Sequence, residues 1–349
     1  MDTGATITRA DADALRERVA CLARPETYPH APPQVTPIET HMSWVFLAPP
    51  LVYKLKKPVR YPFLDYRALD ARRRFCGEEL AINQRLGGDT YRRVLPLTRG
   101  PDGQLALDGE GEPIDWLVEM RLLPKADLLD HRLASGRITP GEIDGVGAAL
   151  VAFYQRATPE ISGGSVYPAH LFEEVGICRA QFQSTPLGLD PALSLPLTEQ
   201  VEQALRAACP EIDQRIAAGF IVEGHGDLRP EHVCLVPPPR IFDSLDFDRR
   251  MRILDPFDEV GYLGLECAFS GAPWIGPRLL ALLERAIGHP PSARLQATYR
   301  AFRALLRARI ALAHLFDDTP ETPERWPDEA RRYLAFCAEA LAAIGMSPQ

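Results

Sequence analysis

Apolar residues follow two different spacings along the chain, and the dominant spacing changes near residue 121. Before that point, short apolar runs typical of strands are mixed with stretches of helical periodicity. The predicted strands are 44–47, 51–56, 94–97, 105–107 and 116–120, and the predicted helices are 10–23 and 66–86. We therefore expect an N-terminal part in which a sheet is accompanied by helices.

After residue 121 the apolar spacing stays close to 3.6 residues, which predicts a mostly helical part. The predicted helices are 141–156, 167–183, 198–208, 258–269, 276–287, 292–315 and 327–345. One strand-rich interruption, at 220–247, predicts a hairpin. The pattern therefore predicts an α+β protein with a helical and proline-rich lead-in at 1–34, a first domain at 35–120 and a second domain at 121–349.

Composition narrows the class of protein. The chain has 349 residues, of which 46% are hydrophobic and 25% charged, as in a globular protein with a substantial core. Its net charge of -8 argues against nucleic acid or an anionic membrane as a partner. Seven scattered cysteines without a CxxC pair argue against a zinc site or a disulfide scaffold. Since the N-terminus is charged and no apolar run could span a membrane, we expect a cytoplasmic protein, of open oligomeric state.

Two aspartates flank the predicted hairpin. Asp227 lies in the loop HGDLRPEH before the first strand, and Asp243 follows the second strand 16 positions later. A carboxylate in such a loop can accept the proton of a substrate hydroxyl, and His225 can brace the loop backbone. A carboxylate at a strand end suits Mg²⁺ bound to nucleotide phosphates. The simpler alternatives are an Asp that caps a turn and a solvated acidic loop.

Lysine is rare in this chain: of 39 basic residues four are lysine, and three of these fall within 54–57. Lys54 and Lys56 share one face of the predicted strand, because side chains alternate along a strand. Glu79 lies on the apolar face of the predicted helix, where an unpaired carboxylate would be costly, so we expect a lysine partner for it. The alternative is a glutamate at the edge of the core, with Glu78 as a competitor for the pairing.

The loop HGDLRPEH resembles the catalytic loop of the protein-kinase-like fold, and its His-Gly-Asp form resembles the aminoglycoside phosphotransferase-like branch of that fold. Four further segments, 39–59, 63–80, 252–263 and 299–312, resemble one bacterial subgroup of this family. Some members of the subgroup are fused to a gluconate-kinase-like P-loop domain. The resemblance covers roughly 35–315, and no GxxxxGK[ST] motif occurs in the sequence.

The resemblance implies a bilobal protein-kinase-like fold, with a small N-terminal lobe of antiparallel sheet and one main helix, and a larger, mostly helical C-terminal lobe. It implies an ATP-dependent phosphotransferase that uses Mg²⁺ and phosphorylates a hydroxyl of a small molecule, with GTP as an alternative donor. By position, Asp227 would be the catalytic base and Asp243 the Mg²⁺ ligand. Lys54, paired with Glu79, would contact the nucleotide phosphates, and Lys56 is the second choice for that contact.

Two further segments acquire expected roles in nucleotide binding from the same resemblance. The backbone of 118–121 would read adenine, and the turn at 39–43 would lie over the phosphates although it contains no glycine. The residues expected to bind the nucleotide in these segments are Glu119, Met120, Arg121, Thr40, His41 and Ser43.

The acceptor pocket would be built from the second domain, including 164–183 and 258–275. Glu173, Glu174 and Asp246 would permit a cationic acceptor there. Acids on helices also serve solubility, however, and this second explanation is the more ordinary one.

His232 is a departure from the family pattern, because it stands where the family has an Asn that supplies an oxygen to magnesium. Mg²⁺ prefers oxygen ligands, whereas imidazole suits zinc and later transition metals. Either His232 turns away and water fills the coordination site, or activity is reduced, or the metal preference has changed, with His232 as an unusual metal ligand. The simpler alternative is that His232 only hydrogen-bonds Asp227 or Asp243. The second function hypothesis follows from this residue: a pseudokinase that binds nucleotide or a partner without turnover. A hydrolase that uses His225 and Asp227 is a third, weaker hypothesis, because no GxSxG motif is present.

Overall fold

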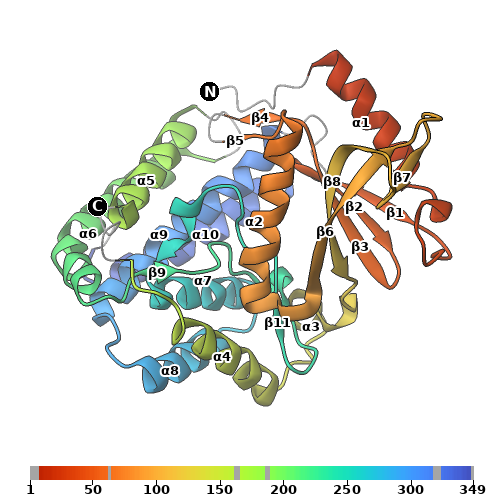
Figure 1. Ribbon diagram of the computed structural model, residues 1–349. Helices are drawn as coiled ribbons and strands as arrows, with labels where there is room; N and C mark the ends of the chain where they lie inside the picture. The colour runs from red at the N-terminus through yellow and green to blue at the C-terminus, as the bar shows by residue number, and fades with distance from the viewer. Residues whose placement is uncertain (1–7, 62–63, 161–165, 185–188, 317–323, 347–349) are drawn as a thin grey trace. The chain divides into compact units, whose positions relative to one another are not determined.

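The computed structural model describes residues 8–61, 64–160, 166–184, 189–316 and 324–346, and its chain forms two compact units (Figure 1). The N-terminal unit is Met1–Leu128 together with Cys234–Asp248. The C-terminal unit is Leu129–Val233 together with Arg249–Gln349. The expected division of the chain at 120/121 did not include the segment Cys234–Asp248 in the N-terminal unit. That division stays a prediction.

The N-terminal unit is built on a six-stranded antiparallel sheet in the order β1-β2-β3-β8-β6-β7 (Figure 1). Its strands are β1 (Thr36–Glu39), β2 (Ser43–Ala48), β3 (Leu51–Lys56), β6 (Tyr91–Arg99), β7 (Leu105–Leu107) and β8 (Glu112–Arg121), and a separate pair is formed by β4 (Arg60–Tyr61) and β5 (Leu64–Asp65). The five predicted strands are confirmed. β1 was missed because all four of its residues are exposed, so it carries no alternation of apolar and polar positions.

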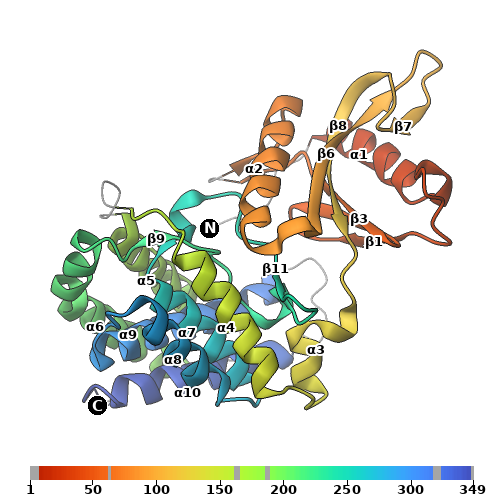
Figure 2. The ribbon, with the colours of Figure 1, turned by 60° about the horizontal axis from the view of Figure 1, so that its bottom comes forward.

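Two helices cover opposite faces of this sheet (Figure 2). α1 (Arg9–Leu22) contributes Leu15 and Leu22 to a core that includes Tyr53 and Leu55 of β3. α2 (Leu69–Gly87) contributes Cys76 to a second core on the other face. Side chains alternate along a strand, so the lysines of β3 lie on the face that α2 covers. The predictions of both helices are confirmed.

The buried face of α2 is more polar than the sequence pattern indicated. The residues of α2 that are buried are Arg72, Cys76, Glu79, Asn83 and Gly87. Three of these side chains are charged or polar, which apolar periodicity does not detect. The inner face of α2 is therefore specialised for polar contacts. The helix ends at Gly88, its C-cap, which has φ of 55°.

The C-terminal unit is mostly helical, as predicted, around a core formed by α5, α6, α7, α9 and α10. Its helices are α3 (Leu129–Ala134), α4 (Pro140–Tyr154), α5 (Val166–Ser184), α6 (Pro191–Ala217), α7 (Pro256–Phe269), α8 (Ile275–Ile287), α9 (Ala293–Ala313) and α10 (Arg325–Ala342). The seven predicted helices are confirmed, and α3 was not predicted. α6 extends beyond the predicted 198–208 at both ends. Pro196 and Pro210 lie inside it, and because proline ordinarily ends a helix, the predicted helix was too short.

The predicted hairpin between Asp227 and Asp243 is present, although it is shorter than the predicted range 220–247. β10 (Val233–Cys234) pairs with β11 (Arg240–Ile241) across the proline turn, which contains a cis peptide between Pro237 and Pro238. The earlier strand, β9 (Val222–Glu223), pairs instead with β12 (Ile253–Leu254) of the same unit. Short 3₁₀ helices complete the described structure, at Pro25–Thr27, Gly88–Thr90, Lys125–Asp127, Pro230–His232, Arg249–Arg252 and His314–Phe316.

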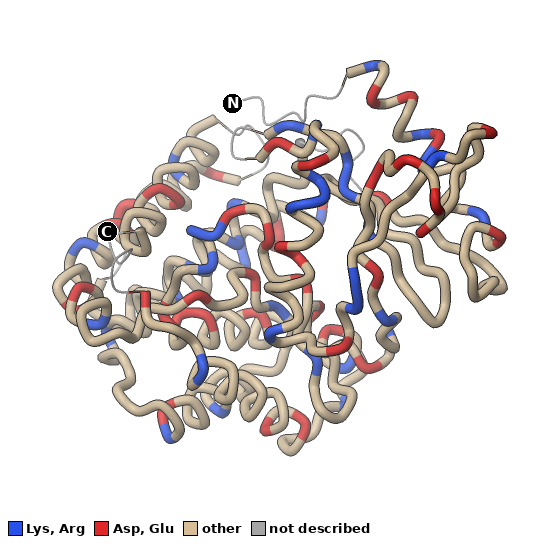
Figure 3. The backbone as a smooth tube through the Cα atoms, viewed as in Figure 1, with Lys and Arg blue, Asp and Glu red and all other residues tan. Residues whose placement is uncertain are grey.

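The distribution of charged residues and the state of the cysteines are as follows in the described residues. Acidic and basic residues are interspersed along the backbone of each unit (Figure 3). The seven cysteines all lie in the described residues and are free thiols, six of them buried. Among the described residues, no helix is long and apolar enough to cross a membrane.

Candidate active site

A cluster of charged residues lies between β3 and α2 in the N-terminal unit. Lys54 Nζ lies 2.8 Å from Glu79 Oε1, and Lys56 Nζ lies 2.7 Å from Glu79 Oε2. Glu79 is fully buried and Lys56 is 1% exposed. The expected pairing of Glu79 is thus present, and this carboxylate serves both lysines at once rather than one of them. Glu78, the competitor, is half exposed and lies near Arg74 on the same helix.

Each lysine has a second carboxylate partner from the segment after β11. Lys54 Nζ donates to Asp243 Oδ1 at 3.0 Å, and Lys56 donates to Asp246. The two lysines and three carboxylates form one chain of ion pairs, in the order Asp243, Lys54, Glu79, Lys56, Asp246. The segment after β11 is therefore joined by charge to the strand and the helix of its own unit.

Two side chains fix the backbone at Asp243. The Asp243 N–H donates to Tyr91 Oη at 3.2 Å, and the Ser244 N–H donates to Asn83 Oδ1 at 2.8 Å. Asn83 Nδ2 in turn donates to the Glu79 carbonyl at 3.0 Å. Asp243 has φ of 59°, a left-handed conformation that is uncommon for residues other than glycine and is often found at functional sites. The contacts offset the cost of this conformation and aim the carboxylate.

The side chains of Lys54 and Lys56 differ in how far they are exposed to solvent. The side chain of Lys54 is 17% exposed and that of its partner Asp243 is 47% exposed, whereas the side chain of Lys56 is 2% exposed. Burial alone would lower the pKa of each lysine, but the neighbouring carboxylates raise both pKa values well above the ordinary one. Asp246 is the counterpart: burial would raise its pKa, and the lysines lower it. All three groups are therefore charged at neutral pH, and Lys54 is the lysine that a ligand can reach.

The donor chemistry at Asp243 fits magnesium. A half-exposed carboxylate is the type of oxygen ligand that Mg²⁺ takes together with phosphate oxygens and water. Among the residues that the structure describes, no three His, Cys, Asp or Glu side chains are grouped as a complete metal site. Asp243 is thus a single carboxylate whose chemistry suits Mg²⁺, and the described residues supply no further group of such ligands around it.

The predicted phosphate-covering segment forms the turn between β1 and β2. Thr40 Oγ1 donates to the Ser43 carbonyl at 2.9 Å and accepts the Ser43 N–H at 3.0 Å. Ser43 is buried, whereas Thr40 and His41 are exposed. The side-chain hydroxyl of Thr40 thus takes over the turn-forming role that a glycine often has, which accounts for a glycine-free loop at this place.

The predicted adenine-reading segment is the end of β8. Glu119 pairs in register with Tyr53 of β3, and Met120 pairs with Val52. Met120 packs in the core on the α2 face, while Glu119 is buried and Arg121 is exposed. The Glu119 side chain is bound by Tyr53 and two arginines, so the expected contact to adenine concerns the backbone of this segment rather than that carboxylate.

In the C-terminal unit, the loop His225–His232 is held by one buried carboxylate. Glu259 of α7 accepts the N–H groups of His225, at 3.0 Å, and of Gly226, at 2.6 Å, and it accepts the Tyr154 hydroxyl. Gly226 has φ of 88°, a conformation that glycine adopts without steric cost, which explains the His-Gly-Asp form of the loop. Burial raises the pKa of Glu259 in spite of these donors.

Two histidines hold the backbone of Asp227 from either side. The Asp227 N–H donates to His225 Nδ1 at 3.2 Å, and His232 Nδ1 lies 2.8 Å from the Asp227 carbonyl oxygen. A carbonyl only accepts, so His232 carries its proton on Nδ1, while His225 must have Nδ1 unprotonated. The two rings stack with centroids 5.8 Å apart. The expected brace by His225 is present, and of the alternatives for His232 the hydrogen bond to Asp227 is the one in place.

The carboxylate of Asp227 has a cationic partner within the loop. Arg229 Nε lies 2.9 Å from Asp227 Oδ1, and Arg229 Nη1 lies 2.6 Å from Glu231 Oε1. The Tyr262 hydroxyl donates to Asp227 Oδ1 at 3.4 Å. Burial would raise the pKa of Asp227, but Arg229 and the two histidines lower it. Asp227 is therefore ionised at neutral pH, the state in which a carboxylate accepts a proton or a hydrogen bond.

The two glutamates of the predicted acceptor region lie near arginines. Of the segment 164–183, residues 164 and 165 lie outside the described residues, and the rest belongs to α5. Glu174 pairs with Arg309 at 2.9 Å and Glu173 lies 3.7 Å from Arg250. The two glutamates that would have favoured a cationic acceptor thus have guanidinium partners.

Sequence reasoning missed Asn83, Tyr91, Glu259 and Tyr262. Asn83 follows Glu79 by four positions and so shares its helix face, a signal that the sequence contained. Tyr91, Glu259 and Tyr262 act through contacts between residues 34 or more positions apart, for which one sequence offers no signal.

No protein-family model matches the chain. It is 28% identical over 326 residues to uncharacterized protein Rv2004c of Mycobacterium tuberculosis (strain H37Rv) and to uncharacterized protein Mb2027c of Mycobacterium bovis. The match covers 89% of this chain and 62% of each relative, so the chain spans less than two thirds of their length. The relatives therefore do not by themselves indicate an activity.

Solved structures share the fold. A choline/ethanolamine kinase family protein from Mesorhizobium loti matches with a TM-score of 0.52 at 15% identity, covering 97% of this chain and 100% of that chain. The choline kinase from Cryptosporidium parvum matches with a TM-score of 0.54 at 11% identity, covering 95% and 98%. A thermostable mutant of aminoglycoside phosphotransferase APH(4)-Ia matches with a TM-score of 0.50 at 12% identity, covering 89% and 94%. The chain thus has the kinase-like fold expected from its sequence.

Proposed function

We propose that this chain is a small-molecule kinase, which transfers the γ-phosphate of ATP, or of GTP as the alternative donor, to a hydroxyl group. The observation that supports this most strongly is Lys54, whose ammonium group contacts both the buried Glu79 and the half-exposed Asp243. A lysine oriented by a helix carboxylate, beside a carboxylate suited to Mg²⁺, is the arrangement by which kinases bind nucleotide phosphates. The kinases among the structures with the same fold support the same class of reaction.

Each group has a defined task in this proposal. Lys54 binds the phosphates, and Glu79 keeps its ammonium group in place. Asp243 would hold Mg²⁺, which would supply positive charge against the negative charge that develops on the phosphates. Lys56, with almost no exposed surface, neutralises Glu79 and Asp246 and has a structural task.

Asp227 orients the acceptor hydroxyl and accepts its proton. Its lowered pKa keeps it ionised, and the two histidines and Glu259 fix the backbone that carries it. His232 acts in this proposal by positioning Asp227 rather than by binding the metal. Its Nδ1 proton points to the Asp227 carbonyl, and imidazole is a poor ligand for Mg²⁺. The free thiols suit a reducing compartment such as the cytoplasm.

A second candidate is a pseudokinase that binds nucleotide without turnover. The observation in its favour is His232, because an imidazole has no oxygen to offer a metal and its Nδ1 faces the Asp227 carbonyl. The two candidates make the same prediction for nucleotide binding and opposite predictions for turnover.

Thermal unfolding of the full chain with ATP or GTP, each with Mg²⁺ or Mn²⁺, tests both candidates. We expect at least one combination to raise the melting temperature, and Lys54→Met to abolish the rise. Lys125→Met is the matched control, because Lys125 is exposed and belongs to the same unit. If no combination stabilises the wild-type chain, both candidates are wrong. Phosphate transfer to sugars, amino alcohols and aminoglycosides then separates the kinase from the pseudokinase.

A further inference from the structure

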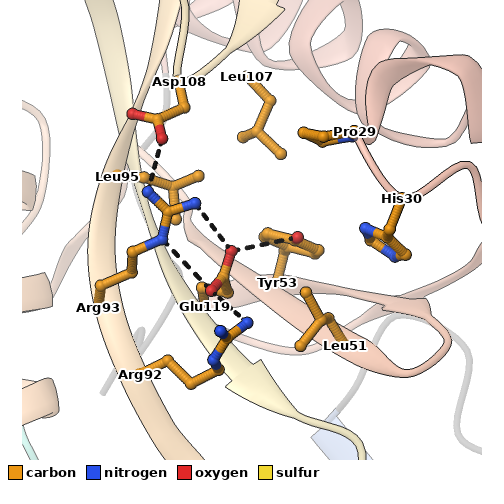
Figure 4. Close-up of a pocket in the computed structure, with 10 residues that line it drawn as sticks. All are labelled: Pro29, His30, Leu51, Tyr53, Arg92, Arg93, Leu95, Leu107, Asp108 and Glu119. Carbon is orange, nitrogen blue, oxygen red and sulfur yellow. Dashed lines mark hydrogen bonds and ion pairs between the residues drawn. The ribbon is translucent and has the colours of Figure 1, made fainter.

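The N-terminal unit contains a cavity of about 290 Å³ on the face of the sheet opposite Lys54. Tyr53 of β3 and Glu119 of β8 line it, and their side chains point away from the face that α2 covers (Figure 4). Leu51, Leu95 and Leu107 supply apolar walls. The cavity is therefore separate from the cluster around Lys54, although the backbone of Glu119 belongs to the segment expected to contact adenine.

Two consecutive arginines converge on the buried carboxylate in this cavity. Glu119 is 2% exposed and lies 2.8 Å from Arg92 Nη1 and 3.2 Å from Arg93 Nη2. The Tyr53 hydroxyl donates to it at 3.3 Å (Figure 4). Neighbouring residues of a regular strand point to opposite faces, so both arginines could not reach one carboxylate from a regular β6. The register shift between Tyr91 and Arg93 in the β6–β8 pairing makes it possible.

A second irregular residue borders the cavity. Asp108 has φ of 57° and its carboxylate lies 2.5 Å from Arg93 Nη1. A left-handed conformation at a non-glycine residue and a bulge are both features that recur at binding sites. The Asp108 N–H also donates to the Pro96 carbonyl of β6 at 2.8 Å, and the Asp108 side chain adds a carboxylate to the lining of the cavity.

The donors in the cavity exceed the acceptors that the structure assigns to them. A guanidinium group has five N–H donors, and Arg92 uses one nitrogen for Glu119. The side chains of Arg92 and Arg93 are 43% and 50% exposed, so part of each guanidinium faces water. The oxygens of Glu119, by contrast, are buried and already occupied. A group that enters the cavity therefore meets N–H donors at its polar end and leucine side chains along its body.

We propose that this cavity binds a small amphipathic anion, with a carboxylate or phosphate at Arg92 and Arg93 and an apolar or aromatic body against the leucines. The planar fork of arginine pairs with both kinds of anion through two parallel hydrogen bonds. The volume is close to the lower end of ordinary ligand cavities, which limits the body to about one ring. The ligand site is distinct from the nucleotide site of the proposed function.

Titration calorimetry of the full chain tests the site with three probes of one shape. Benzoate is the anionic probe, benzamide the neutral one and benzylamine the cationic one. We expect benzoate to bind at least tenfold more tightly than either of the others. Equal affinity for the three probes, or tighter binding of benzylamine, would overturn the proposal.

Two variants with opposite expected effects locate the binding. Arg92→Gln should weaken benzoate binding about tenfold, equivalent to about 1.4 kcal/mol, while Glu119 keeps Arg93 as a partner. Asp108→Asn should strengthen binding severalfold, because it removes a negative charge beside Arg93, and Asn tolerates the left-handed conformation. Arg60→Gln, an exposed arginine of the same unit, should change nothing. Asp108→Asn also tests the proposal if Arg92→Gln does not fold, since unchanged or weaker binding in Asp108→Asn contradicts it.

Discussion

Replacing Lys54 or Lys56 of β3 by methionine tests the two roles proposed for them: phosphate binding by Lys54 and a structural task for Lys56. Methionine has nearly the same length and removes only the charge and the donors. In Lys56→Met the chain loses a cation that is 2% exposed and neutralises two carboxylates, Glu79 and Asp246. In Lys54→Met it loses a cation that is 17% exposed, while Glu79 keeps Lys56 and the half-exposed Asp243 is solvated.

The expected costs follow from this difference in burial. Removing one partner of a buried ion pair typically costs about 3 to 5 kcal/mol, because the other charge stays buried without compensation. Lys56→Met leaves Glu79 with Lys54, so we expect the lower end, about 3 kcal/mol of the free energy of unfolding. For Lys54→Met the carboxylate that loses its partner reaches water, and we expect about 1 kcal/mol, as for exposed pairs.

Urea denaturation of the full chain at neutral pH measures these costs in unfolding free energy. The rise in stability on adding nucleotide measures nucleotide binding. Lys54→Met should lose the stabilisation by nucleotide, and Lys56→Met should retain it once the lower baseline stability is taken into account. Lys125→Met should change the unfolding free energy by less than about 0.5 kcal/mol. The reasoning is refuted if Lys54→Met costs more stability than Lys56→Met, or if Lys54→Met binds nucleotide as well as the wild type.

Three further predictions concern the groups that position the aspartates. Asn83→Leu should weaken the affinity for nucleotide in the presence of Mg²⁺ about tenfold, because the Ser244 N–H loses its acceptor. Calorimetric titration with nucleotide at fixed Mg²⁺ measures this affinity. Arg229→Gln should move the acidic limb of the pH–rate profile to higher pH. Because the arginine lowers the pKa of Asp227, its loss lets the carboxylate take up a proton at less acidic pH. An unshifted limb would contradict this role of Arg229. His232→Ala should lower turnover at least tenfold and His232→Asn should keep it within a few-fold, whereas a large gain in His232→Asn would favour the pseudokinase.

Periodicity predicted most of the fold but not the inner face of α2. The strand 51–56 places Tyr53 and Leu55 in one core, and the helix 276–287 buries Leu279 and Leu283, so the spacing of apolar residues is a local signal in both. α2 buries Arg72 and Asn83, whose partners are distant in sequence. α6 continues through Pro196 and Pro210 because tertiary packing outweighs their unfavourable propensity.

The candidate site could be predicted as a set of residues but not as a network. Rare lysines and a buried-face glutamate indicated the pairing of Lys54 with Glu79, and the structure adds that Lys56 shares the same carboxylate. The partner of His232 was one of several alternatives, since a sequence does not fix which nitrogen faces which oxygen. Glu259, which holds the Asp227 loop by two backbone N–H groups, lies more than thirty positions from them and left no local signal.

The role of Asp227 is tested most directly by phosphate transfer from γ-labelled ATP, in the presence of Mg²⁺, to a panel of small hydroxyl compounds. The account predicts transfer to at least one of them by the wild-type chain, and a loss of at least a hundredfold in Asp227→Asn with nucleotide binding retained. Asp213→Asn, an exposed aspartate of the same unit, should transfer as the wild type does. Transfer that persists in Asp227→Asn would contradict the account.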